Sequence, residues 1–179
     1  MKSMDYGDTW TRLPGVPATV QGVTLDPLDN QRVFASTPNG LWRSENGGQT
    51  WTMVLTTSTW NVTFAPGAHI AYAATRQAGV FKSLDRGNTW FPINNGITNL
   101  VMGRSAPVVV HPEDSETIYA ASEGGGGVYK SKDGGATWTQ VNLHLDDTSV
   151  YGLAMDPFRP KTLYVSTPSG VYKTLSGAE

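Results

Sequence analysis

The feature that most constrains this sequence is a motif, S-x-[D/N]-x-G-x-T-W, that occurs four times. Its copies span residues 3–10, 44–51, 83–90 and 131–138, and their tryptophans are 41, 39 and 48 residues apart. Self-similarity with a period near 40 residues is typical of repeat architectures in which each copy marks one structural unit. The chain is therefore expected to be built from successive similar units.

Other segments repeat around each motif. Directly upstream lies Gly-[Leu/Val]-aromatic-[Arg/Lys]-[Ser/Thr], as in GVFKS and GVYKS, and further upstream lie two apolar segments separated by Pro-containing turns. Each unit thus contains four short strands, labelled A to D in their order along the chain. No segment shows the spacing of apolar residues that is typical of a helix. The pattern predicts an all-β fold, a β-propeller of four-stranded antiparallel blades with four blades' worth of strands per chain. The expected boundaries are a D strand at 9–13, blades at about 20–55, 59–93 and 105–142, and A-B-C strands at 150–174.

The motif is expected to form the turn between strands C and D. Asp or Asn can accept hydrogen bonds from the backbone that follows, and Gly can adopt a positive φ. A recurring Trp is suited to packing between units, since it can bury roughly 150–250 Å². The alternative, a set of metal-binding or acid-base carboxylates, is disfavoured because one copy carries Asn and the copies lie on separate units. The structural positions are Ser3, Asp5, Gly7, Trp10, Ser44, Asn46, Gly48, Trp51, Ser83, Asp85, Gly87, Trp90, Ser131, Asp133, Gly135 and Trp138.

These motifs resemble the Asp-box, or BNR, repeat of the sialidase-like β-propellers over nearly the whole chain. The resemblance extends to sialidases, xyloglucan-active endoglucanases, sortilin-type receptor ectodomains and photosystem II assembly propellers. It implies that the box is a structural hairpin facing away from the active site. Because the chemistries of these families differ widely, the resemblance implies fold more than function. Sialidase activity is not expected, because the segment WFPI (90–93) lacks the Arg of the sialidase Phe/Tyr-Arg-Ile-Pro motif.

Composition excludes several classes of protein. The 179 residues carry a formal net charge of -2, which argues against electrostatic binding of nucleic acid. No apolar run approaches ~18 residues, so no membrane span is expected, and the N-terminus has no apolar stretch typical of a secretory signal. The absence of Cys removes disulfides and thiolate chemistry and leaves the compartment undetermined. We expect no cofactor and no metal.

Candidate functional residues lie on the face formed by the D-to-A and B-to-C loops, which are the irregular parts of the repeat. Trp60 and Tyr151 hold equivalent positions near the start of strand A, where aromatic rings can stack on sugars or pack the inner strand. Arg104, Arg76 and His144 are polar candidates nearby. Asp146 and Asp147 form the best acidic pair, although a solvated loop is the simpler interpretation.

Three arrangements of the half-blades at the two ends of the sequence stay open. The chain closes a ring with a second copy of itself, belongs to a larger propeller, or forms a four-bladed monomer. The main functional prediction is a non-catalytic propeller module that binds a carbohydrate or protein ligand through the loop face. The alternatives are a glycoside-hydrolase-like propeller, or a fragment of one, and a purely structural, self-assembling repeat unit.

Overall fold

A computed structural model describes residues 1–16, 19–67, 69–105 and 107–178. Within these ranges every regular element is a β-strand, as the repeat pattern predicts. None of the described segments forms an apolar helix long enough to cross a membrane.

The strands form four antiparallel sheets in which neighbours in sequence are neighbours in space. Three sheets have four strands, and the last has three among the described residues. The strands are β1 (Gly22–Asp26), β2 (Asp29–Thr37), β3 (Gly40–Ser44), β4 (Thr52–Leu55), β5 (Thr59–Phe64), β6 (Ala71–Thr75), β7 (Val80–Ser83), β8 (Phe91–Pro92), β9 (Val108–Val110), β10 (Ile118–Ser122), β11 (Gly127–Ser131), β12 (Thr139–Gln140), β13 (Gly152–Met155), β14 (Leu163–Thr167) and β15 (Gly170–Thr174).

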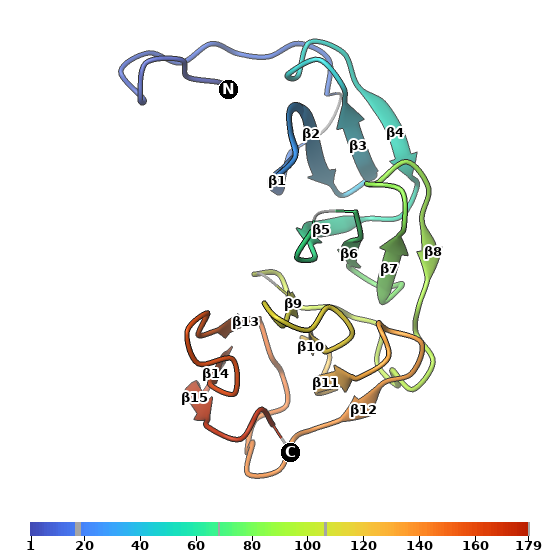
Figure 1. Cartoon of the computed structure of the whole chain (residues 1–179), viewed down its shortest axis with the longest axis vertical. Helices are drawn as coiled ribbons and strands as arrows, with labels where there is room; N and C mark the ends of the chain where they lie inside the picture. The colour runs from blue at the N-terminus through green and yellow to red at the C-terminus, as the bar shows by residue number, and fades with distance from the viewer. Residues whose placement is uncertain (17–18, 68, 106, 179) are drawn as a thin grey trace.

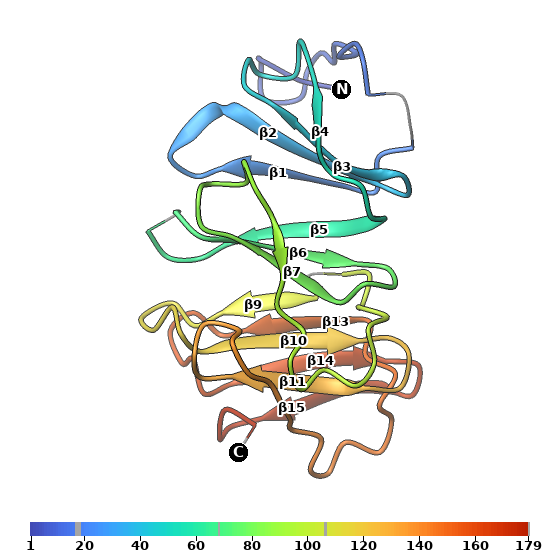
Figure 2. The same ribbon diagram turned by 90° about the vertical axis from the view of Figure 1, so that its right-hand side faces the viewer.

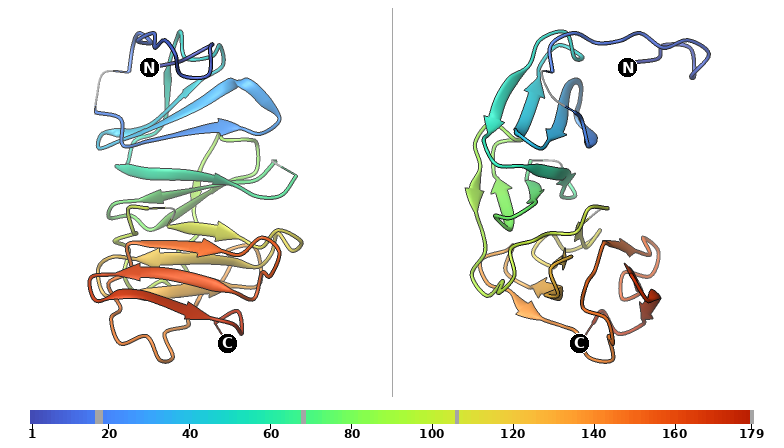
Figure 3. Two further views of the ribbon diagram at one scale, coloured as in Figure 1. Left: turned by 90° about the vertical axis from the view of Figure 1, so that its left-hand side faces the viewer. Right: turned by 180° about the vertical axis from the view of Figure 1, so that it is seen from behind.

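The sheets are the blades of a β-propeller arranged along an arc (Figure 1). The first strands, β1, β5, β9 and β13, line the concave side, and β4, β8 and β12 lie on the convex side. Figure 2 shows the first and second blades one above the other with the third and fourth overlapping below them, and the rear view in Figure 3 shows the same arc with its open side. The N-terminal hairpin (residues 1–13) projects beyond the first blade at one end, and β13–β15 lie at the other.

The N-terminal hairpin differs from the expected D strand at 9–13. Thr11 pairs with Lys2 through two backbone hydrogen bonds, Lys2 N to Thr11 O at 2.7 Å and Thr11 N to Lys2 O at 2.8 Å. This pair is an isolated bridge outside the named strands. A single bridged pair is too short a ladder to hold residues 9–13 as a strand.

The copies at 44–51, 83–90 and 131–138 form the turn that joins the third and fourth strands of a blade, and the copy at 3–10 forms the turn of the N-terminal hairpin. In the copy at 131–138, Ser131 Oγ donates to Asp133 Oδ1 at 2.8 Å and accepts from Gly135 N at 2.8 Å. Asp133 also accepts from Thr137 N at 2.8 Å and from Thr137 Oγ1 at 2.6 Å. These hydrogen bonds, led by those from Thr137, lower the pKa of Asp133 to about 2. The carboxylate is therefore engaged by its own turn.

The copy with Asn retains the turn. Ser44 Oγ donates to Asn46 Oδ1 at 2.9 Å, and Thr50 N donates to the same oxygen at 2.9 Å. The difference is that Asn46 Nδ2 donates to Thr50 Oγ1 at 2.8 Å, whereas Asp133 accepts from Thr137. The turn thus needs a side-chain oxygen that accepts hydrogen bonds, and it forms with or without a negative charge on that side chain.

Successive blades are joined by the basic residue of each third strand. Arg43 Nη1, Lys82 Nζ and Lys130 Nζ each reach a Gly carbonyl in the turn of the following blade. The acceptors are Gly87 O at 3.0 Å, Gly134 O at 2.7 Å and Gly177 O at 2.8 Å, respectively. A charged donor makes a stronger hydrogen bond than a neutral one, so this contact fixes one blade against the next.

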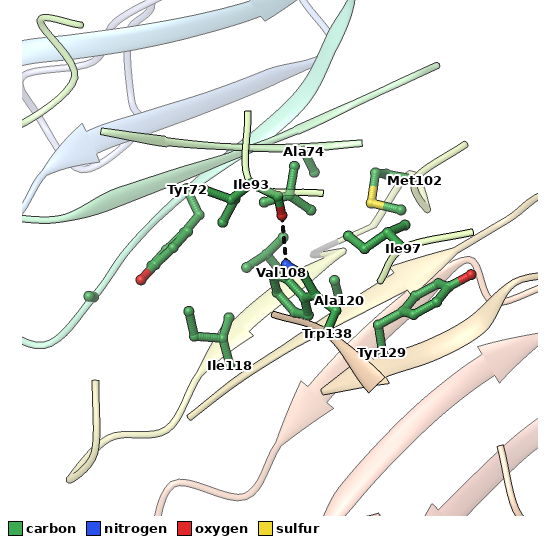
Figure 4. Packing of buried hydrophobic residues seen from close by; sticks show 12 residues of the cluster. Tyr72, Ala74, Ile93, Ile97, Met102, Val108, Ile118, Ala120, Tyr129 and Trp138 are labelled. Carbon is green, nitrogen blue, oxygen red and sulfur yellow. Dashed lines mark hydrogen bonds between the residues drawn. The ribbon is translucent and has the colours of Figure 1, made fainter. Parts of the chain in front are cut away.

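The box Trp supplies the apolar part of the same contact. Trp138 is 5% exposed, and its Nε1 donates to Ile93 O of the preceding blade at 2.6 Å (Figure 4). Trp90 packs edge-on against Phe34 of the preceding blade, with ring centroids 6.4 Å apart. Trp10, in the N-terminal hairpin, is 61% exposed.

We predict that Trp138→Ala destabilises the fold strongly, whereas Phe158→Ala does not. Replacing a buried aromatic residue by Ala costs roughly 3–5 kcal/mol, because the cavity is only partly refilled. Phe158 is 92% exposed and serves as the matched control. Thermal and urea unfolding check this prediction, and equal melting temperatures for the two variants would contradict it.

We also predict that the box carboxylates make the fold sensitive to acid. The pKa of Asp133 is depressed in the folded state, so its stabilisation is present above the unfolded value near pH 4 and is lost as the pH falls toward 2. Asp133→Asn should flatten the fall in melting temperature over this interval, because the turn tolerates Asn at residue 46. The reverse change, Asn46→Asp, should steepen it. Identical pH profiles for the three proteins would refute a role for the charge.

Candidate functional site

The candidate site lies where the concave strands begin. Here the backbones of neighbouring blades come into direct contact: Ser105 N donates to Tyr151 O at 2.9 Å, and Gly103 packs against Tyr151. A Cβ on Gly103 would lie 2.5 Å from Tyr151 O, which leaves no room for a side chain. The loop before β9 is thereby pressed against the start of β13, and its next residue, Arg104, is fixed in place.

Arg104 contacts side chains of the second and third blades, and its chain neighbours Gly103 and Ser105 contact the backbone of Tyr151 in the fourth. Its guanidinium lies 5.7 Å from the centre of the Trp60 ring, a distance typical of a cation-π contact. Its Nη2 is 2.6 Å from Glu123 Oε1, and its Nε donates to Glu123 Oε2 at 2.8 Å. The hydrogen bond and charge of Glu123, with a smaller contribution from Tyr151, raise the pKa of Arg104. We call Trp60, Arg104, Glu123 and Tyr151 the Arg104 cluster.

The two aromatic residues of the cluster are exposed to different degrees. Trp60 is partly buried and packs against the core between the second and third blades. Its Nε1 is buried and has no hydrogen-bond partner among the described residues. Tyr151 is 38% exposed, and the Arg104 side chain is 63% exposed. The groups open to a ligand are therefore the side chain of Tyr151, whose backbone lies against this loop, and the paired charges of Arg104 and Glu123.

The acidic pair has surroundings that suit a loop better than a catalytic acid. Asp147 Oδ1 accepts from Ser149 N at 3.0 Å, and Asp147 Oδ2 accepts from Ser169 Oγ at 2.9 Å. The backbone hydrogen bond from Ser149 is the main cause of the lowered pKa of Asp147. A general acid requires a raised pKa, so this carboxylate is poorly suited to that role. Asp146 is exposed.

The structure separates the other polar candidates. Arg76 is exposed in the turn between β6 and β7, where its backbone N donates to Ser58 O at 2.9 Å. His144 has a positive φ of 61° and lines a cavity with Val141 and Leu145. Among the described residues, no group of three or more His, Asp or Glu side chains is arranged to hold a metal ion.

Glu123 was missed in the sequence analysis. It is the second residue of the segment SEGGGG (122–127), whose four glycines predict a flexible strand connector. A lone carboxylate before a glycine run gives no signal of its partner, since Arg104 lies 19 residues away. The pairing becomes visible only when the loop before β9 and the turn after β10 are placed side by side.

Comparison of this chain with known proteins supports the β-propeller fold. The chain is 32% identical over 136 residues to a xyloglucanase from Paenibacillus sp.. It superposes on an ancestral GH74 enzyme with a TM-score of 0.72 and 23% identity over 92% of its length. It superposes on the GH74 xyloglucanase from Xanthomonas campestris with a TM-score of 0.68 and 17% identity over 89%. No family model matches the sequence.

The chain is short beside these proteins. The aligned region is 70% of this chain but 12% of the Paenibacillus protein, and the chain covers 24% and 30% of the two solved structures. The similarity to the solved structures defines a β-propeller fold of the kind found in GH74 enzymes.

Proposed function

We propose that this chain is part of a glycoside-hydrolase-like β-propeller and that the Arg104 cluster binds a carbohydrate. The sequence similarity to a xyloglucanase supports this alternative of the sequence analysis more than the main prediction of a non-catalytic module. We also assign the four boxes to the Asp-box (BNR) repeat. The sequence match and the Ser-Asp-Gly-Thr hydrogen bonds support that assignment.

The observation that carries the proposal is that the loop at 103–105 brings together groups from three blades, with Arg104 between Trp60 and Glu123 and its neighbours against Tyr151. An exposed ring beside a hydrogen-bonding pair suits a sugar, because the apolar face of a pyranose stacks on the ring while its hydroxyls bond to charged groups. Tyr151 supplies the ring, and Arg104 and Glu123 supply the donors and acceptors. A β-linked glucan such as xyloglucan is the ligand that the similarity favours.

The cluster is proposed to bind rather than to cleave. Most glycosidases use two carboxylates that flank the scissile bond, one of them protonated as the acid. Glu123 is held in an ion pair with Arg104, and Asp147 is hydrogen-bonded within its loop with a lowered pKa. Hydrolysis by a complete enzyme would thus draw its carboxylate pair from outside the Arg104 cluster.

We predict that Tyr151→Ala weakens binding of a xyloglucan oligosaccharide at least tenfold, equivalent to about 1.4 kcal/mol, because the exposed stacking surface is lost. Isothermal titration calorimetry on the 179-residue chain measures the effect. Phe158→Ala is the control, since Phe158 lies between β13 and β14, at the other end of β13 from Tyr151. Arg104→Ala should weaken binding as well.

Absence of binding by the unmodified chain would refute the carbohydrate site. Equal losses from Tyr151→Ala and Phe158→Ala would show that binding is not located at the cluster. Release of reducing sugar by the unmodified chain would contradict the assignment of binding without cleavage.

A further inference from the structure

A cavity of about 260 Å³ lies between the third and fourth blades. Its apolar lining includes Val128, Val141, Leu145, Leu153, Leu163 and Tyr172. Several of these belong to one hydrophobic cluster that joins the two blades. His144, Lys173, Thr174 and Ser176 complete the lining as polar members. The apolar part of the cavity leaves side chains of the cluster without packing partners, so it is a position that a further apolar side chain can fill.

The equivalent position between the second and third blades is filled by Trp138. Trp138 belongs to the cluster that contains Val80, Ile93, Ile97, Val108, Ile118 and Tyr129. Each of these six residues has its repeat equivalent in the cavity lining: Val141 follows its box Trp by three residues, as Ile93 does, and Leu145 by seven, as Ile97 does. The backbone agrees, because Asn94 Oδ1 accepts from Val80 N at 2.8 Å and Asn142 Oδ1 accepts from Val128 N at 2.7 Å. The cavity therefore has the lining of an indole site.

Trp10 is the box Trp suited to occupy such a site, since it is 61% exposed. The residues that follow it already lie against the first blade as the outer strand of a preceding blade would. Leu13 packs at Gly48, where a Cβ would lie 2.5 Å from Leu13 Cδ1, as Ile93 packs at Gly135. Trp51 Nε1 donates to Pro14 O at 3.1 Å, much as Trp138 Nε1 donates to Ile93 O.

The fourth blade offers the matching strand edge. Among the described residues β15 pairs only with β14, so its other edge is open to a fourth strand. In the other blades the residue after the box Trp pairs with the basic residue of the third strand, as Thr139 pairs with Lys130 and Phe91 with Lys82. By the same rule Thr11 would pair with Lys173. The sequence around Lys173 is similar to the sequence around Lys2, the residue with which Thr11 pairs in this structure.

We propose that residues 9–13 of a second copy of this chain add to the edge of β15 and place Trp10 in the cavity. The Lys2–Thr11 bridge is exchanged for a Thr11–Lys173 pair between copies. The N-terminal hairpin and the fourth blade lie at opposite ends of the arc (Figures 1 and 3), so a twofold axis makes the contact twice and leaves neither end open. Pairing also covers strand edges that otherwise promote association.

A disulfide experiment tests the pairing directly, because the chain has no Cys of its own. Residues in a hydrogen-bonded antiparallel pair have Cα atoms about 5.5 Å apart, within disulfide range. Thr11→Cys and Lys173→Cys are prepared as separate single variants, checked for native circular dichroism, mixed and oxidised. We expect a covalent dimer linking one variant to the other in the mixture, and much less of any dimer from either variant alone.

Solution mass gives the second readout. Light scattering should give about twice 19.3 kDa for the unmodified chain, and Trp10→Ala should shift the mass toward 19.3 kDa while retaining the circular dichroism spectrum. Tyr6→Ala is the matched control, because Tyr6 is fully exposed in the same hairpin, and Trp10→Phe should retain part of the dimer.

Three results would overturn the proposal. The first is a stable mass of 19.3 kDa with no cross-link in the mixture. The second is an intrachain disulfide in the Thr11→Cys, Lys173→Cys double variant at monomer mass, which would show a ring closed within one chain. The third is a dimer that survives Trp10→Ala unchanged, which would place the interface elsewhere.

Discussion

The structure depends on one contact that is repeated between successive blades. A basic side chain of one blade bonds to a Gly carbonyl in the next box turn, as Lys82 does to Gly134, and the Trp of that box packs back on the preceding blade, as Trp138 does on Ile93. No blade can bury its own faces, so the stability of each comes largely from its neighbours. The box hydrogen bonds serve this contact, because they set the positions of both the Gly carbonyl and the Trp.

The sequence was sufficient to predict the blades because the same physical requirements recur in every unit. The turn needs an acceptor such as Asp133 or Asn46, the strands need β-forming residues, and a spacing near 40 residues leaves room for four strands. The D strand at 9–13 was the exception. Its preference for a strand is local, but a strand also requires a partner, and the structure gives Thr11 only the single pair with Lys2.

The candidate site was predicted only in part, and the reason is physical. Trp60 and Tyr151 could be found because they recur at the same repeat position, and the structure brings Arg104 to the Trp60 ring and its chain neighbours to the Tyr151 backbone. Glu123 could not, since it comes from an irregular loop whose partner depends on how two blades are placed. Loops that do not repeat are free of the packing rule that fixes the strands, so they can vary in function on an unchanged fold. The carbohydrate proposal therefore combines a repeated ring position, Tyr151, with Arg104 and Glu123 from loops that do not repeat.

The direction of the blade contact also bears on assembly. Each unit presents an indole on one side and an apolar site for an indole on the other. Any linear array of units therefore has one indole without a site at one end and one empty site at the other. In the described residues these are the exposed Trp10 and the cavity lined by Val141 and Leu145. Closing a ring satisfies both at once, whereas adding more blades only moves them to new ends. The curvature of the arc then decides how many units are needed before the two can meet, which makes blade number a consequence of the angle at each Trp contact.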